Sequence, residues 1–207
     1  MKVIAVLARK GGTGKTTIAV HLGVLAEAQG MKVLFFDLDP QKSLTAWWET
    51  REASTPPLVQ SDTRRLAGHL KAAREEGYDL AVIDSPPAIG FETAHVAGLA
   101  DLALVPLRPS ILDLRAVQDT LTIITATRTP ALLVLNSCIP PTAAGEAPGT
   151  LDARKALAAP VAETSLAQRL DFARALNAGE AVTEAAPDSR AAAEIARLWD
   201  EVKERIA

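Results

Sequence analysis

The sequence predicts an α/β fold, a three-layer sandwich in which a mostly parallel, twisted sheet carries helices on both faces. Nearly unbroken apolar runs recur along the chain, as strands require when both faces of a sheet are covered. Amphipathic segments of helical length separate these runs, and this alternation builds βαβ units with right-handed crossovers. The length suits one such domain, so we expect a single domain across residues 1–207 with no internal repeat.

Each strand is expected where an apolar run lies between turn residues. The strands are predicted at 2–8, 33–36, 80–84, 102–107, 131–135 and, as a short last strand, 161–162. The helices are predicted at 16–29, from a Ser43 cap through Trp48, and at 63–75, 91–98, 110–125, 150–158, 164–178 and 189–206. Residues 52–60 and 139–149 each contain a Pro-Pro pair, so both predict loops, and the second is expected to be mobile.

The composition limits what the protein can be. The single cysteine, Cys138, cannot form an internal disulfide, which fits a reducing, cytoplasmic setting and excludes an iron–sulfur site made of paired cysteines. The sequence shows no signal peptide and no apolar run of membrane-spanning length, so no membrane association is expected. The net charge of -3 does not indicate nucleic-acid binding, so any DNA contact must come from a local patch.

Residues 8–17, Ala-Arg-Lys-Gly-Gly-Thr-Gly-Lys-Thr-Thr, have the composition of a phosphate-binding loop. Backbone N–H groups of such a loop, and of the helix after it, point at phosphate oxygens. Lys15 is placed to reach the β- and γ-phosphates, and Thr16 to hold Mg²⁺ through its hydroxyl. The remaining residues that form the cradle are Gly11, Gly12, Thr13, Gly14 and Thr17. The alternative is an ordinary tight turn, which the order strand, loop, Lys-Thr-Thr and helix disfavours.

The loop departs from the strict P-loop pattern at two positions. Arg9 stands where that pattern has its first glycine, and a second lysine, Lys10, precedes the glycines. Lys-Gly-Gly-Thr-Gly-Lys-Thr resembles the deviant Walker A box of the ParA/MinD ATPases, and the chain is similar to the small, ParF-like members. The resemblance implies a deviant P-loop NTPase without the N-terminal helix-turn-helix region of larger relatives. It also implies that Lys10 crosses a homodimer interface to the partner's nucleotide.

Three aspartates follow buried strands, at the sheet edge where open α/β proteins bind ligands. A lone aspartate there is often a helix N-cap, but three of them behind a phosphate loop indicate a metal and water site. Asp84, before Ser85-Pro86-Pro87, looks like the Walker B acid that holds Mg²⁺ through water, with switch II after it. Residues 37–41 resemble switch I. That resemblance assigns Asp39 to the attacking water and Asp37 to the water shell of the metal.

Hydrolysis by a single protomer is expected to be slow. The sequence places no arginine as an internal finger, and only Gln41 is a candidate for a water-orienting glutamine. Lys10 is the natural substitute, because a lysine supplied in trans neutralises charge on the transferring phosphoryl group. We therefore expect hydrolysis of ATP to need an ATP-bridged dimer.

Two further segments resemble parts of the family's nucleotide site. Asn136 follows the strand at 131–135, where family members often contact adenine, although an asparagine in a turn is common. The sequence lacks an Asn-Lys-x-Asp tetrapeptide, which favours ATP over GTP. The Pro-Ser-x-x-Asp segment that ends at Asp113 resembles one near the family's dimer interface. Its other interpretation is a strand exit in which Ser110 caps a helix.

Residues 168–182 resemble a region that relatives use to hold DNA without reading its sequence. The DNA-binding candidates are Arg169, Arg174 and Arg190, followed by Arg197 and Lys203. Acidic residues outnumber basic ones after residue 150, so the alternative is that these side chains are solvated helix faces. A few arginines aligned across a dimer would still give weak, salt-sensitive binding to phosphates.

With the resemblance, the sequence predicts an ATPase that uses ATP and Mg²⁺, dimerises on ATP, binds nucleoid DNA non-specifically and positions a cargo. The cargo is a plasmid, a chromosome origin or a protein cluster, and a ParB-like or adaptor protein stimulates hydrolysis. Two alternatives are a MinD-like regulator on a membrane and a metabolic P-loop ligase or kinase. The apolar stripe from Ile195 to Ile206 has acids on its polar side, so we expect it to pack on the sheet and not on a membrane.

Overall fold

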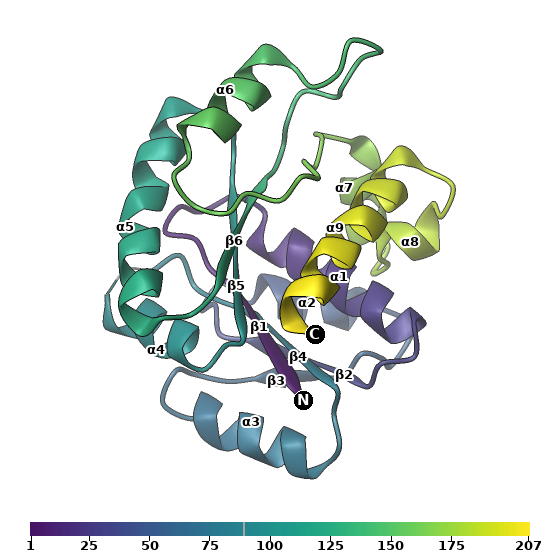
Figure 1. Ribbon diagram of the computed structural model, residues 1–207. Coiled ribbons are helices and arrows are strands. Elements are labelled where there is room, and N and C mark those ends of the chain that lie inside the picture. The colour runs from purple at the N-terminus through teal and green to yellow at the C-terminus, as the bar shows by residue number, and fades with distance from the viewer. Residues whose placement is uncertain (89) are drawn as a thin grey trace.

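The structure is a computed structural model that describes residues 1–88 and 90–207. At its centre is a six-stranded sheet in the order β3-β2-β4-β1-β5-β6, in which every pairing between strands is parallel. The predicted α/β fold is confirmed (Figure 1). The strands are β1 Lys2–Val6, β2 Val33–Asp37, β3 Leu58–Gln60, β4 Leu80–Asp84, β5 Leu102–Leu107 and β6 Ala131–Leu135.

Helices cover both faces of the sheet because successive strand residues point to opposite sides. In β1, Ile4 and Val6 pack into the core on one face, while Val3 and Ala5 pack into the core on the other. The first face is covered by α1 Lys15–Ala28, α2 Ser43–Thr50, α7 Leu170–Asn177, α8 Val182–Ala185 and α9 Arg190–Ile206. The second face is covered by α3 Leu66–Glu75, α4 Phe91–Gly98, α5 Ile111–Thr127 and α6 Pro148–Ala156.

The last helix, α9, packs its apolar stripe into the core on the first face of the sheet, as the sequence predicts. Ile195, Leu198, Trp199 and Val202 are fully buried, and the indole N–H of Trp199 donates to Gln29 after α1 (Nε1 to Oε1, 2.9 Å). The stripe of α9 therefore belongs to the core. Within the described ranges of the chain, no helix is both long and apolar enough to cross a bilayer.

The loop expected at 52–60 contains an edge strand, so this part of the prediction was wrong. Leu58–Gln60 forms β3, which pairs with the second half of β2. The Pro-Pro pair that suggested a loop lies directly before the strand, and the carbonyl of Pro57 accepts the N–H of Phe35 at 2.9 Å. Proline is tolerated where an edge strand starts because no ladder N–H is needed from it there.

The helix expected at 164–178 forms only over its second half, Leu170–Asn177. The residues before it form two isolated parallel bridges, Val161 with Leu133 of β6 and Ala167 with Cys138, in place of the short strand expected at 161–162. Two carboxylates of α9 hold this backbone. Glu201 accepts two backbone N–H groups at 2.8 Å, and Glu194 accepts a third at 3.1 Å. These long-range hydrogen bonds replace the intrahelical ones that the local pattern predicted.

The segment 139–149, expected as a loop, is tied to the fold near its end. Pro148 occupies the first turn of α6, where a missing N–H costs nothing. The carboxylate of Glu146 accepts from the guanidinium of Arg154 at 2.9 Å and from the hydroxyl of Ser165 at 2.6 Å. The helix consequently runs Pro148–Ala156 instead of the predicted 150–158.

Candidate nucleotide-binding site

The carboxyl ends of β1, β2 and β4 bring the phosphate loop and two of the predicted acids to one edge of the sheet. Val6 of β1 and Asp37 of β2 are both direct register partners of Asp84 in β4. The two aspartates therefore lie on adjacent strands, at the point where each strand ends. Residues 7–14 leave β1 beside them and lead into α1. Parallel pairing thus assembles one site from motifs that are far apart in the sequence.

The phosphate loop requires glycine at two of its positions. Gly12 and Gly14 have φ of 71° and 97°, a left-handed backbone that favours glycine. Gly14 also has no room for a side chain, because a Cβ there would lie 2.1 Å from Nδ2 of Asn136. At Gly11 a Cβ would meet nothing within 4 Å, so crowding does not require glycine there. Since α1 begins at Lys15, its N-terminal N–H groups follow directly on the loop.

Thr16 and Asp84 form the polar centre of the site. The Thr16 hydroxyl donates to Oδ2 of Asp84 at 2.6 Å, and Oδ1 is buried with no hydrogen-bond partner among the described residues. Burial raises the pKa of Asp84 to about 7, against the opposing effects of the Thr16 hydrogen bond and the charge of Lys15. Hydroxyl and carboxylate oxygens are ligands that Mg²⁺ prefers, and a water bound to such an ion would satisfy the orphaned oxygen. The residues present therefore fit Mg²⁺.

Lys15 lies at the same edge with its side chain largely buried. Only 7% of the residue is exposed. Desolvation lowers the pKa of its ammonium group, while the carboxylates of Asp84 and Asp39 act to raise it. A desolvated cation is costly by itself, so this position becomes more favourable when an anion binds next to it. The charge on a phosphate is the anion that the surrounding loop is shaped to hold.

Asp37 and Asp39 take different places in the segment predicted as switch I. Oδ2 of Asp37 accepts from the backbone N–H and the hydroxyl of Thr45 at 2.9 and 2.7 Å, and Oδ1 accepts from the Asp39 N–H at 3.0 Å. Asp37 thus caps α2 from the preceding strand. The cap predicted from Ser43 was wrong, because Ser43 is the first residue of the helix itself. Asp39 lines a groove of about 590 Å³ together with the loop and Gln41.

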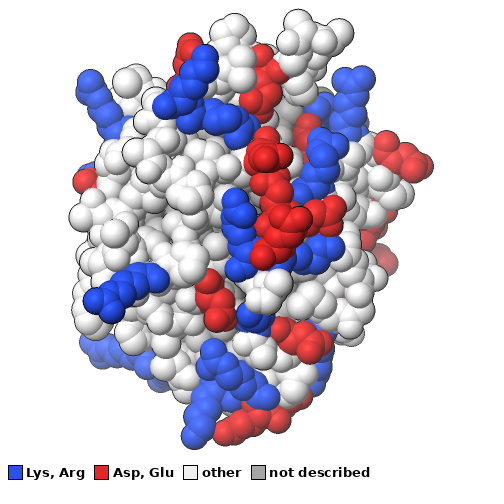
Figure 2. Space-filling model, viewed as in Figure 1, with Lys and Arg blue, Asp and Glu red and all other residues white. Residues whose placement is uncertain are grey.

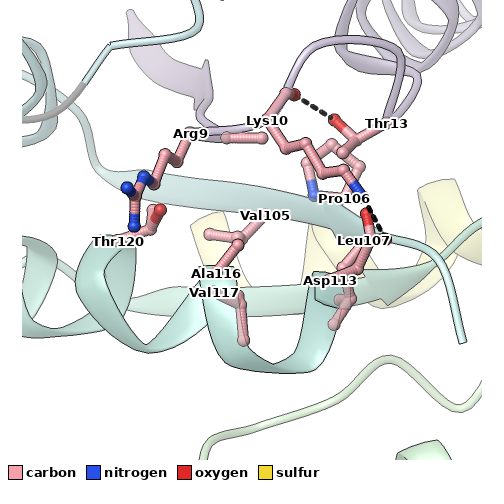
Figure 3. A pocket seen from close by; sticks show the side chains of 11 residues that line it. Arg9, Lys10, Thr13, Val105, Pro106, Leu107, Asp113, Ala116, Val117 and Thr120 are labelled. Carbon is pink, nitrogen blue, oxygen red and sulfur yellow. Dashed lines mark hydrogen bonds and ion pairs between the residues drawn. The ribbon is translucent and has the colours of Figure 1, made fainter. Parts of the chain in front are cut away.

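Lys10 is held by α5 of its own protomer. Its ammonium group donates to Oδ2 of Asp113 at 2.8 Å, and Figure 3 shows the two side chains pointing toward one another across the gap between loop and helix. The hydroxyl of Ser110 donates to the same oxygen at 2.5 Å. Burial acts to raise the pKa of Asp113, but the hydrogen bonds from Lys10 and Ser110 outweigh it and lower the pKa. The side chain of Lys10 is 42% exposed and that of Asp113 is 3% exposed, so the lysine lies at the surface while its carboxylate partner is buried.

The segment before α5 confirms the helix cap, one of the two interpretations that its sequence left open, and its place near a dimer interface stays a prediction. Ser110 caps α5 by accepting the Asp113 N–H at 3.2 Å, and the same segment contacts the phosphate loop. Arg108, which no motif singled out, donates its guanidinium to the carbonyl of Gly12. The only local signal in the sequence is that Arg108 stands directly before Pro109-Ser110. The contact joins residues that are distant in the chain, so local patterns do not show it.

Asn136, predicted to contact adenine, lies at the end of β6 and is buried. Its Nδ2 donates to the carbonyl of Thr13 at 2.7 Å. A second groove, of about 600 Å³, begins here and is lined by Gly12, Gly14, Thr17, Gln168, Arg169 and Phe172, among others. Because this groove adjoins the loop, a nucleotide with its phosphates in the loop can extend its base into it. Contact of Asn136 with adenine stays a prediction.

The arginines predicted to bind DNA divide into two kinds. The guanidinium of Arg169 donates to Oε1 of Glu194 at 2.6 and 3.0 Å, and both side chains are largely buried. This ion pair joins the start of α7 to α9 and accounts for Arg169 without DNA. Arg174 and Arg190 are exposed. On the face that Figure 2 shows, basic side chains are interspersed with acidic ones and form no continuous patch.

The fold and the site together define a P-loop nucleotide-binding protein. The profile of the CobQ/CobB/MinD/ParA nucleotide binding domain matches residues 4–184. The chain belongs to this family, as a member of its ParA/MinD group of ATPases. The maintenance of carboxysome distribution protein A of Halothiobacillus neapolitanus is 34% identical, over 96% of this chain and 95% of that protein. The chromosome-partitioning ATPase Soj of Thermus thermophilus is 28% identical, over 98% and 96%.

Solved structures share the fold over nearly the whole chain. The cell division ATPase MinD of Pyrococcus furiosus has a TM-score of 0.80 at 20% identity, with 98% of each chain covered. The apo McdA of Cyanothece has a TM-score of 0.79 at 23% identity, with 100% of each chain covered. A cobyrinic acid a,c-diamide synthase of Mycobacterium smegmatis reaches 0.71 at 20% identity, over 98% and 94%. Since cell division proteins and a synthase share this fold, the function has to be argued from the site residues and the sequence relatives.

Proposed function

We propose that the protein is a ParA-type ATPase that dimerises around ATP, holds nucleoid DNA without sequence preference and uses hydrolysis to position a cargo in the cytoplasm. A partner protein stimulates hydrolysis, which is weak without it. The observation that carries the proposal is the position of Lys10. This lysine of the phosphate loop is held at the protomer surface by Asp113, where a second protomer can reach it.

Within one protomer, the site residues divide the work of transferring the γ-phosphoryl group to water. Lys15 and the N–H groups of the loop bind the β- and γ-phosphates. Thr16 would hold Mg²⁺ directly and Asp84 would hold it through water, and the ion would supply positive charge to the phosphate oxygens. Asp39, on the wall of the groove, accepts a hydrogen bond from the attacking water and orients it. The products are ADP and phosphate.

In the part of the chain that the structure describes, Lys15 is the one cation that lines the groove of Asp39, so a second positive charge over the transferring phosphoryl group has to come from elsewhere. Lys10, once released from Asp113, supplies this charge to the phosphates of the partner protomer. An arginine that acts in this way in other P-loop enzymes contributes roughly 10³–10⁵ in rate. The lysine of this ion pair is 42% exposed while Asp113 is 3% exposed, so releasing Lys10 leaves a buried carboxylate and has a cost that the multiply charged triphosphate must outweigh. Hydrolysis is then slow in the monomer and faster in the ATP-bridged dimer.

A protein assembly is the cargo that we propose first. The Halothiobacillus neapolitanus relative is named for the distribution of carboxysomes and matches over 95% of its own length. The protein ParA of Rhizobium radiobacter is equally identical at 34%, but the match covers 51% of that protein. A plasmid or a chromosome origin is the alternative cargo. An adaptor or ParB-like protein would link the cargo to the ATPase in each case.

The two rival functions make different demands on the structure. A MinD-like membrane regulator needs an amphipathic helix whose apolar face is available to lipid, and the apolar face of α9 is buried in the core. A metabolic ligase or kinase needs a second substrate, and its ATP turnover would depend on a small molecule. The burial of α9 therefore favours the partition ATPase over the first rival, and turnover measurements separate it from the second.

The proposal is tested by the oligomeric state and DNA binding of the protein with a non-hydrolysable ATP analogue. We expect the wild-type protein to be a dimer by light scattering and to retard any long duplex, and the ADP form to do neither. Lys10→Ala should bind the analogue yet stay monomeric. Lys71→Ala, which removes an exposed charge from α3, is the matched control and should dimerise like wild type. A wild-type protein that stays monomeric with the analogue would contradict the proposal.

A further inference from the structure

We propose that Asn136 is a positioning residue for the phosphate loop. The affinity for the triphosphate group then depends on Asn136 whether or not the ligand carries a base. This inference rests on nucleotide binding at the loop but not on dimerisation, DNA or cargo. It changes the role that the sequence assigns to Asn136, because the side chain binds the backbone of the phosphate loop and not the adenine base.

The Asn136 side chain is fixed to the loop and to the sheet. Nδ2 donates to the carbonyl of Thr13 at 2.7 Å, a bond between residues 123 positions apart. The backbone N–H of Asn136 donates to the carbonyl of Leu107 at 2.8 Å, which continues the pairing of β5 with β6. The residue is 8% exposed. A hydrogen bond buried to this extent between a rigid strand end and a loop holds the loop in one place.

The bond to Thr13 also decides where the next backbone N–H points. In a trans peptide the C=O of one residue and the N–H of the next point in opposite directions. Fixing the Thr13 carbonyl toward Asn136 therefore turns the N–H of Gly14 away from Asn136. The N–H of Gly14 is one of the loop donors that bind phosphate in a P-loop. Asn136 thus presets one of the donors of the cradle.

The contact between Gly14 and Asn136 is too close to be incidental. A Cβ on Gly14 would lie 2.1 Å from Nδ2 and 3.3 Å from Cγ of Asn136. The carboxamide thus occupies the space that any other residue at position 14 would need. Thr13 is itself buried, and its hydroxyl donates to the carbonyl of Lys10 at 3.4 Å. The loop and the amide therefore form one packed unit, which is the arrangement expected of a support.

The decisive experiment compares ligands with and without a base. Affinities of wild type and Asn136→Ala are measured by calorimetry for Mg²⁺ with ATP, GTP and inorganic tripolyphosphate. A lost buried hydrogen bond lowers affinity by about tenfold. We expect this loss for all three ligands, with an unchanged ratio of ATP to GTP affinity. Gln168→Ala, which alters the same groove at a side chain that does not hold the loop, is the matched control and should leave tripolyphosphate binding unchanged.

Base recognition by Asn136 would give a different pattern of affinities. If Asn136→Ala binds tripolyphosphate like wild type while its preference for ATP over GTP collapses, Asn136 reads the base and the proposal is wrong. If no affinity changes, the proposal is also wrong. A wild-type protein that binds none of the three ligands would instead count against the phosphate loop itself.

A measurement on the wild-type protein keeps the test independent of the variant's folding. The side-chain amide protons of Asn136 are followed by NMR exchange in the nucleotide-free protein, with tripolyphosphate and with ATP. A support is already hydrogen-bonded before ligand binds, so one amide proton should be protected in all three states. Protection that appears only with ATP would overturn the proposal.

Discussion

The phosphate-loop edge and the C-terminal helices are built in different ways. At the edge, the register of parallel strands places Asp37 beside Asp84, so the positions follow from where the strands end. In the C-terminal third, the positions of the side chains follow from ion pairs and packing between helices. An example is the ion pair between Arg169, directly before α7, and Glu194 of α9. Short motifs therefore identify the residues of the edge. The basic residues of the C-terminal region can be sorted only by the partners that they have in the fold.

The two regions are in direct contact through α2, the helix that follows switch I. Arg51, just after α2, donates to both carboxylate oxygens of Glu184 at 2.6 and 2.8 Å and to the carbonyl of Gly179 at 3.0 Å. The indole N–H of Trp47 donates to the carbonyl of Glu180 at 3.3 Å. The C-terminal helices are thus attached to the segment that carries Asp39, even though they contribute no acid to the site.

The largest effect is expected at the phosphate-loop edge, from Lys15→Ala. Lys15 is the buried cation among the loop residues that line the Asp39 groove, and its loss removes the point charge on the β- and γ-phosphates. ATP binding should be abolished in a calorimetric titration, and hydrolysis with it. Lys10→Ala is the internal comparison and should retain ATP binding, because Lys10 is held at α5. Equal ATP affinities of wild type and Lys15→Ala would refute the assignment of the cradle.

Asp39→Ala should give the next largest effect, on turnover and not on binding. Removal of a general base or water-orienting group costs roughly 10²–10⁴ in rate. We therefore expect ATP to stay bound and the ATP-bridged dimer to accumulate, as measured by phosphate release and light scattering. Gln41→Ala tests the alternative water-orienting residue of the same groove and should keep most of the activity. If the loss falls on Gln41→Ala and not on Asp39→Ala, the roles are reversed.

Much of the fold and of the edge could be predicted because both depend on local signals. Apolar runs predict buried parallel strands, and the carboxyl ends of such strands meet at one edge. Local patterns, together with the resemblance to the ParA/MinD ATPases, therefore pointed to Asp84 and to the loop from Lys10 to Thr16. The role of Asp37 as the cap of α2 was not predictable, because the signal for a cap at Ser43 is purely local and Asp37 reaches Thr45 across the switch I turn.

What the sequence could not show depends on contacts between distant residues. Lys10 and Asp113 were each part of a noted motif, but their pairing across 103 positions has no local signature. The extended backbone before α7 depends on Glu194 and Glu201 of α9, which outweigh a helical pattern. Arg169 looks like a surface arginine in the sequence, and only its burial against Glu194 shows a structural role.

A stability comparison of Arg169→Ala with Arg174→Ala sharpens this distinction within the C-terminal region. Removing Arg169 leaves the buried carboxylate of Glu194 without its cation, and breaking a buried pair in this way costs about 3 kcal/mol. Arg174 is exposed, so its loss should change the free energy of unfolding by less than about 0.5 kcal/mol. Urea denaturation measures both. Equal stabilities of the two variants would show that the Arg169 pair does not hold α7 to α9.

The contact between His21 of α1 and the start of α8 should make the free energy of unfolding depend on pH. Nδ1 of His21 accepts the N–H of Val182 at 3.1 Å, and burial lowers the pKa of His21 to about 3, with Glu184 acting in the opposite direction. Below an ordinary pKa of 6.5 the unfolded chain binds a proton that the folded protein does not bind until about pH 3. The unfolded state therefore binds more protons in this window, and stability falls as pH falls.

The size of the His21 effect is checked with His21→Gln, which does not titrate. Between pH 6.5 and 5.5 the wild-type protein should lose about 1 kcal/mol more of its free energy of unfolding than the variant does. Urea denaturation at pH 7.5, 6.5 and 5.5 gives the two curves. Parallel curves for wild type and variant would mean that His21 is not the group that titrates.

The smallest expected effect concerns DNA, where the exposed arginines of the C-terminal region are compared with an exposed arginine on the other face of the sheet. Each lost phosphate contact makes the plot of log affinity against log salt shallower by about 0.9, or roughly 2 for a dimer with two copies. Arg174→Ala and Arg190→Ala should show this change in the ATP-analogue dimer, with a few-fold weaker retardation of a long duplex. Arg64→Ala, an exposed arginine before α3 on the second face of the sheet, is the matched control. If all three variants keep the wild-type slope, the C-terminal helices do not hold DNA. If only the Arg64 variant loses slope, the DNA-binding surface lies on the other side of the sheet, and the C-terminal arginines serve only the packing and solvation of their helices.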